Sequence, residues 1–133
     1  IYHNQSNFDL AIENFQKASK INPNDFQIFN NIGNSYLKKR DFKNALENFK
    51  AAFSLSPKNT ITSDSMGNLH YEMGNLSSSL EAFKYSLSID NNNEFAKEKI
   101  SEILCLNGDF NKGLSMYYEI NGKISFTDKV EIT

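Results

Sequence analysis

Apolar residues near the start of the chain recur three and four positions apart, which is the spacing of an amphipathic helix. The members of this stripe are Phe8, Ala11, Ile12, Phe15 and Ala18. The stripe predicts a helix that begins after Asn7 as its N-cap and ends before Pro23. We expect Ile1 and Tyr2 to lie in a separate, preceding helix, because they fall in the slots of Ser35 and Tyr36 one period later.

The same pattern returns every 34 residues. One position of the repeat, or slot, holds a small residue in each copy: Ala11, Ala45, Ser79 and Gly113. The slot four residues later holds an aromatic residue: Phe15, Phe49, Phe83 and Tyr117. The slot three residues before the small one holds a large apolar residue: Phe8, Phe42, Leu76 and Phe110. A polar residue precedes the apolar slot each time: Asn7, Asp41, Asn75 and Asp109. Agreement of these columns over successive copies indicates an array of similar helix pairs, which is stable only when neighbouring pairs stack.

Residues 26–59 hold the complete copy of this unit. Its diagnostic residues are Phe29, Ile32, Gly33, Tyr36, Ala45, Phe49 and Pro57. This stretch resembles a tetratricopeptide repeat, with Phe29 where Trp is commonest. The resemblance implies an all-α fold, a right-handed αα-superhelix of about three and a half helix-turn-helix units. We expect units at 1–25 (partial), 26–59, 60–93 and 94–122, followed by a C-terminal tail or linker at 123–133.

Within a unit, small residues should let the two helices approach closely, as Gly33 and Ala45 would do. In the unit at 60–93, Ser63, His70, Ser79 and Ser86 occupy slots that are usually apolar or small, so we expect this pair to pack less tightly.

Charge and composition exclude several classes of protein. The net charge is −2 and the pI is about 5.7, without the basic stripe of a nucleic-acid binder. No apolar run approaches the length of a membrane span, so no membrane partner is expected. Cys105 is the single cysteine, which excludes an internal disulfide and favours a cytoplasmic setting.

Residues with catalytic chemistry are isolated along the chain. His3, His70 and Cys105 share no spacing typical of a catalytic site or a metal site, so we expect no enzyme activity and no cofactor. His70 should be a packed ring with one nitrogen hydrogen-bonded, and Cys105 a small buried hydrophobe.

The family resemblance implies that the first helices of successive units line a concave groove. The polar residues in those slots are Gln27, Asn30, Asn31, Asn34, Lys38, Asp64, Ser65, Asn68, Glu72, Glu98, Lys99 and Glu102. Amide side chains can pair with the backbone of an extended peptide, so we expect a protein or peptide partner in this groove. Because Asn is abundant throughout the chain, some of these residues should be ordinary solvated surface.

Tetratricopeptide domains that hold chaperone C-termini grip the terminal carboxylate with Lys, Arg and Asn. Here Asn31 occupies one of those slots, but Ile61 and Ser65 stand where the following unit should supply basic residues. Beyond them the groove sequence is acidic around Lys99, which should repel a carboxylate.

Two alternatives to a free-standing peptide-binding scaffold remain. The array could be the substrate-recruiting portion of a larger enzyme such as a glycosyltransferase or sulfotransferase. It could also self-associate through its apolar ends. The tail carries Ile124, Phe126, Val130 and Ile132 in alternation, and we expect residues 123–132 to lie back on the fourth unit or on a neighbouring molecule.

Overall fold

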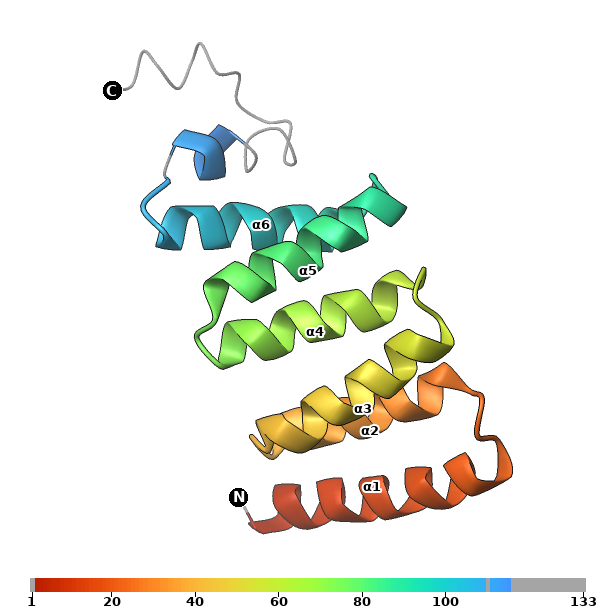
Figure 1. Ribbon diagram of the computed structural model, residues 1–133. Coiled ribbons are helices and arrows are strands. Elements are labelled where there is room, and N and C mark those ends of the chain that lie inside the picture. Colours follow the sequence, from red (N-terminus) through yellow and green to blue (C-terminus); the bar gives the residue numbers. More distant parts are fainter. Residues whose placement is uncertain (1, 110, 116–133) are drawn as a thin grey trace.

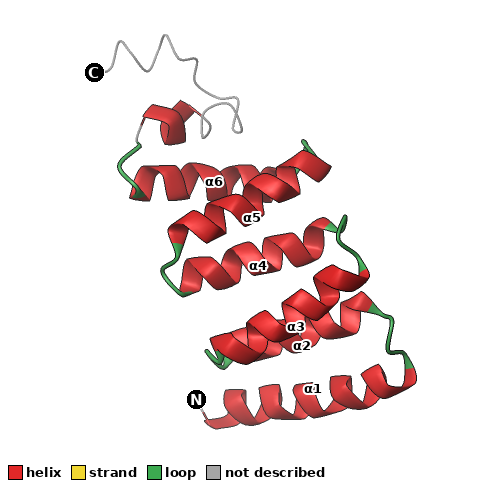
Figure 2. Cartoon of the chain, viewed as in Figure 1, coloured by secondary structure: helices red, strands yellow, loops and turns green. Residues whose placement is uncertain are grey.

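The computed structural model describes residues 2–109 and 111–115 of the chain, and its side chains from residue 7. The helices are α1 (Tyr2–Ile21), α2 (Phe26–Lys38), α3 (Phe42–Leu55), α4 (Thr60–Glu72), α5 (Leu76–Ile89) and α6 (Glu94–Leu106). A short helical segment follows at 111–115. Every regular element in these described residues is a helix (Figure 2).

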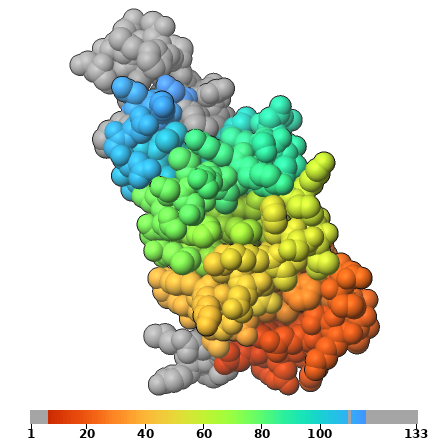
Figure 3. Space-filling view, viewed as in Figure 1, coloured from red at the N-terminus to blue at the C-terminus, as the bar shows by residue number. Residues whose placement is uncertain are grey.

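Successive helices run back and forth and stack into an elongated body, with α1 at one end and α6 near the other (Figure 1). Figure 3 shows the chain following the long axis in sequence order. The most extensive contacts join α2 to α3 and α4 to α5, and the helix α2 also touches α4 directly. The first helices of neighbouring pairs therefore share one side of the stack.

The starts of α2, α4 and α6 are fixed by one capping residue per period. Asp25, Asn59 and Asn93 lie 34 residues apart, and their side chains accept hydrogen bonds from backbone N–H groups of the first helical turn. The three distances are 3.0, 2.8 and 3.1 Å. Satisfying these otherwise unpaired donors makes each helix begin at the same slot of the repeat.

The turns inside the pairs are also periodic. Arg40, Gly74 and Gly108 have positive φ values of 64°, 80° and 86°. The equivalent slot in α1 is Ser6, where the backbone remains helical, so the predicted N-cap at Asn7 and the separate helix before it are wrong. Arg40 shows that a residue other than glycine can take the left-handed conformation at this slot, but α1 continues through Ser6 as one helix.

Aromatic rings seated over glycines form the centre of each complete pair. Phe49 and Phe83 are both fully buried, at 0% exposure. A Cβ atom at Gly33 would lie 2.5 Å from Cε1 of Phe49, and one at Gly67 would lie 2.6 Å from Cζ of Phe83. The close approach predicted at Gly33 is therefore made by the Phe49 ring, beside the buried Ala45.

The serines of the α4–α5 pair are buried and paired. Ser63 and Ser86 share a hydrogen bond of 2.6 Å between their Oγ atoms, and Ser79 Oγ donates to the carbonyl oxygen of Gly67 at 2.8 Å. The next pair reverses this arrangement, because Ser101 on α6 donates to the carbonyl oxygen of Gly113. Each of these buried hydroxyls therefore has a hydrogen-bond partner in the interior.

Candidate binding groove

A pocket of about 410 Å³ lies where α2, α4 and α6 come together. Its lining residues are Leu37, Lys38, Arg40, Asn68, Tyr71, Glu72 and Lys99. Four of these, Lys38, Asn68, Glu72 and Lys99, are among the predicted groove residues. The structure thus brings together side chains from three successive first helices, although they are up to 61 positions apart in the chain. We call this pocket the groove pocket.

The other predicted groove residues differ in their exposure. Gln27, Asn31, Glu98 and Glu102 are exposed, and Asn34 and Asp64 are half-buried. Asn30 and Ser65 are buried, at 4% and 9% exposure. These two side chains are therefore poorly placed to meet a partner. The Oδ1 atom of Asn30 is also buried without a hydrogen-bond partner among the described residues.

Acidic side chains around the groove pocket are engaged by neighbouring residues. Arg40 Nη1 lies 3.3 Å from Glu72 Oε1, and the Arg40 guanidinium also lies over the Phe42 ring, 4.9 Å from its centroid. Asp64 accepts hydrogen bonds from the Asn93 amide, the shorter at 3.1 Å. Two of the predicted groove carboxylates thus have internal partners before any ligand arrives.

Glu102 belongs to a small network on one side of the pocket. Tyr71 donates its hydroxyl hydrogen to Glu102 Oε1 at 2.8 Å, and this hydrogen bond, with burial second, raises the pKa of Tyr71. Lys99 Nζ lies 3.6 Å from Glu102 Oε2 and 4.9 Å from the centroid of the Tyr71 ring. The network holds Tyr71 and Lys99 in place at the pocket wall.

Sequence reasoning missed three lining residues, Leu37, Tyr71 and Arg40. Leu37 and Tyr71 occupy the same slot one period apart, so the 34-residue spacing could have shown that this column faces the groove. Cys105 is the next member of the column and is half-buried. Arg40 could not be found in this way, because its column otherwise holds the turn residues Gly74 and Gly108.

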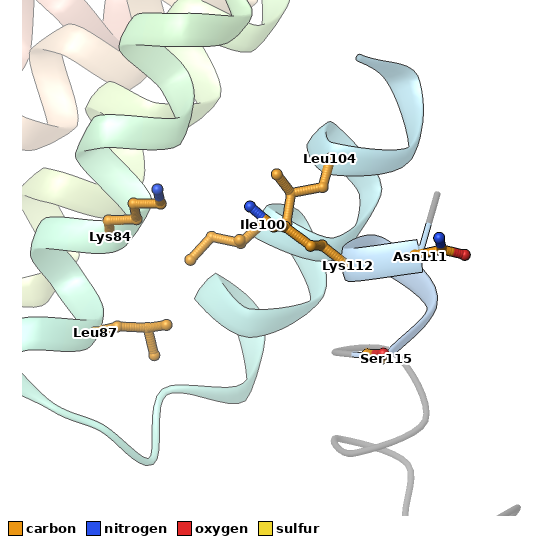
Figure 4. Close-up of a pocket in the computed structure, with 7 residues that line it drawn as sticks. All are labelled: Lys84, Leu87, Ile100, Leu104, Asn111, Lys112 and Ser115. Atoms are coloured by element: carbon orange, nitrogen blue, oxygen red, sulfur yellow. The ribbon is translucent and has the colours of Figure 1, made fainter. Parts of the chain in front are cut away.

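A second pocket, of about 550 Å³, lies between α5, α6 and residues 111–115. Its floor is apolar: Figure 4 shows Leu87 on one side and Ile100 and Leu104 on the other. One period earlier, Phe53 fills the slot of Leu87 and packs against Tyr85, with ring centroids 5.7 Å apart. The slot of Tyr85 falls on Glu119 in this unit, outside the described residues.

His70 differs from its sequence expectation. Its Nδ1 atom is buried without a hydrogen-bond partner among the described residues, whereas we expected one ring nitrogen to be hydrogen-bonded. Burial, and secondarily the nearby charge of Lys50, lowers the pKa of His70. Within the described ranges, no group of three or more His, Cys, Asp or Glu side chains could hold a metal ion. In the same part of the chain, no helix is long and apolar enough to cross a membrane.

Family comparisons agree with this geometry. A TPR repeat model matches residues 1–40, and the tetratricopeptide repeat model matches residues 26–59. The chain carries tetratricopeptide repeats. The helices α4 to α6 lie beyond the matched residues and continue the stack of helices. No curated protein sequence matches the chain.

Solved structures of MamA share the fold of the tetratricopeptide array. A MamA RS-1 ArsTM double mutant has a TM-score of 0.77 at 18% identity, covering 90% of this chain and 67% of that chain. A crystal structure of MamA has a TM-score of 0.76 at 18% identity, with coverages of 89% and 69%. MamA 41-end from Desulfovibrio magneticus RS-1 has a TM-score of 0.77 at 18% identity, with coverages of 92% and 72%. The chain is therefore an all-α, right-handed αα-superhelix. Its tetratricopeptide repeats support a protein-interaction scaffold in general.

Proposed function

We propose that this tetratricopeptide array is a non-enzymatic module that binds an extended segment of a partner protein along α2, α4 and α6. The observation that carries the proposal is the groove pocket, which draws its lining from three successive first helices. Repeat arrays offer their extended concave surface in this way, because each unit adds one strip of side chains to it.

The chemistry of the groove pocket suits a peptide segment. Asn68 is half-buried, and its amide can donate to and accept from a peptide backbone without requiring a particular side chain. Leu37 and Tyr71 add half-buried apolar surface beside it. Such a combination of apolar wall and a few convergent polar groups is typical of binding sites.

A displayed library of random peptides, selected on the full chain, tests this proposal. Selected peptides should lose affinity for a groove variant carrying Lys38→Ala and Asn68→Ala. The matched control carries Asn14→Ala and Lys43→Ala, which change exposed residues of the same types on α1 and α3. Circular dichroism checks that both variants are folded. Lys38, Asn14 and Lys43 are exposed, and exposed substitutions usually change stability by less than about 0.5 kcal/mol, whereas Asn68 is half-buried and its substitution needs this check. Peptides that bind both variants equally well would place their site elsewhere and refute the proposal.

A further inference from the structure

We infer that the groove pocket receives an acidic side chain, Asp or Glu, from within the bound segment. This inference rests on the proposed function and narrows its partner to segments with an internal acidic residue. The sequence predicted that an acidic groove would repel a carboxylate, and this inference reverses that prediction. The prediction did not take into account the internal partners of the acidic residues.

The lining of the groove pocket is cationic although the whole chain carries a net charge of −2. Lys38, Arg40 and Lys99 line it, and Glu72 is the single acidic lining residue. Glu72 is already engaged by Arg40 at 3.3 Å. Lys99 lies 3.6 Å from Glu102, which is not a lining residue, so Lys38 is the lining cation that makes no ion pair with a described residue.

Both lysines can respond to an incoming carboxylate. Lys38 is exposed and makes no ion pair with any described residue. The Lys99 side chain is 26% exposed, and its contact with Glu102, at 3.6 Å, is longer than a strong charged hydrogen bond. Partial burial of Lys99 reduces screening by salt at that lysine, so a carboxylate gains more there than on open surface, whereas Lys38 is exposed.

Asn68 supplies the neutral donor that such a site needs. Its amide can donate to one carboxylate oxygen while the lysines attract the other. Polar groove residues continue on the same helices, with Asn31 and Asn34 on α2 and Glu98 on α6. A segment can therefore pass through the pocket and leave an interior side chain in it, rather than ending there.

The test uses a displayed peptide library whose C-termini are blocked by fusion, followed by synthetic peptides that are acetylated and amidated at their ends. Selected peptides should be enriched in Asp or Glu. Changing that residue to Asn or Gln should weaken binding by roughly tenfold or more, as expected for a lost charged hydrogen bond. Lys38→Glu should weaken binding to the same degree and make it less sensitive to salt. The matched control, Lys43→Glu on α3, changes the net charge equally and should bind like the wild type.

The outcomes separate the two proposals. Some selected peptides could lack acidic residues and bind the Lys38→Glu variant normally, yet lose affinity for the variant with Lys38→Ala and Asn68→Ala. That result would overturn the preference for an acidic side chain but would support binding in the groove. If no peptide with a blocked C-terminus is selected, while a parallel library displayed with free C-termini yields binders, the proposal is also overturned, because the carboxylate would then come from the chain end. Peptides indifferent to every groove change would refute the proposed function itself.

Discussion

A methyl group added at Gly33 would meet the Phe49 ring. The new Cβ would lie 2.5 Å from Cε1 and 2.6 Å from Cδ1 of that ring, whereas carbon atoms prefer separations of about 3.5–4.0 Å. Phe49 is fully buried in a cluster with Ala45 and Leu69, so the ring cannot retreat by about 1 Å without moving its neighbours. We expect Gly33→Ala to destabilise the protein.

Two effects of opposite sign set the magnitude. Replacing Gly by Ala inside a helix is ordinarily stabilising by about 1 kcal/mol. Overpacking a dense core costs about 1–3 kcal/mol, and a displacement of this size in a fully buried ring belongs in the upper half of that range. The net loss should be about 1–2 kcal/mol. For a chain of this length that corresponds to a fall in melting temperature of roughly 4–7 °C.

Urea unfolding followed by circular dichroism measures the change in the free energy of unfolding. The deciding comparison repeats Gly33→Ala in a protein that already carries Phe49→Leu. The smaller side chain relieves the clash, so the same substitution should become neutral or stabilising there. An equal loss in both backgrounds, or a gain in the wild type, would refute the packing argument. Gly67→Ala offers an independent repeat, because its Cβ would lie 2.6 Å from the Phe83 ring.

Two further predictions concern pH and the tail. Burial lowers the pKa of His70 from its ordinary value of 6.5, so the contribution of the neutral ring to stability should be full above pH 6.5 and should fall as the pH drops below it. The variant His70→Leu, which places the residue type of Leu104 at this slot, should remove that loss. Urea titrations at several pH values measure it. The pKa of Asp41 is lowered from 3.8 mainly by its hydrogen bond with Asn44, so its contribution to stability is present above pH 3.8 and is lost as the pH falls below that value. Residues 123–132 lie outside the described residues, and deleting everything after Gly122 should lower the melting temperature or increase self-association in sedimentation. An unchanged melt and an unchanged monomer would make this segment a linker.

The periodic features of the fold could be predicted because they depend on local chemistry. Cap residues such as Asn59 and Asn93 act within one turn of the helix that they start, so their 34-residue spacing marks helix starts directly. The continuity of α1 could not be predicted in this way. Its columns match those of the later second helices. Whether the helix breaks at Ser6 depends on the backbone conformation of that one residue, and among the described residues positive φ values occur at Arg40, Gly74 and Gly108.

The groove could be predicted only in outline. The repeat identifies which helices line it, but the exposure of each side chain depends on how neighbouring pairs are tilted. Asn30 and Asn34 both belong to the predicted groove slots, yet Asn30 is buried and Asn34 is half-exposed. The charges along the sequence also did not show that the Glu72 carboxylate is paired with Arg40, which is 32 positions away in the chain.

The groove pocket cannot be built by one helix pair. Lys38 belongs to the α2–α3 pair, Asn68 to the α4–α5 pair, and Lys99 to α6, so their convergence requires two interfaces between successive units. In a repeat protein each interface contributes separately to stability, and an interface that opens locally separates the side chains on its two sides. Affinity in the groove must therefore depend on the stacking of the units as well as on the lining residues. A core substitution such as Gly33→Ala can weaken binding without touching the groove, which is why the groove variants have to be compared with controls of equal stability.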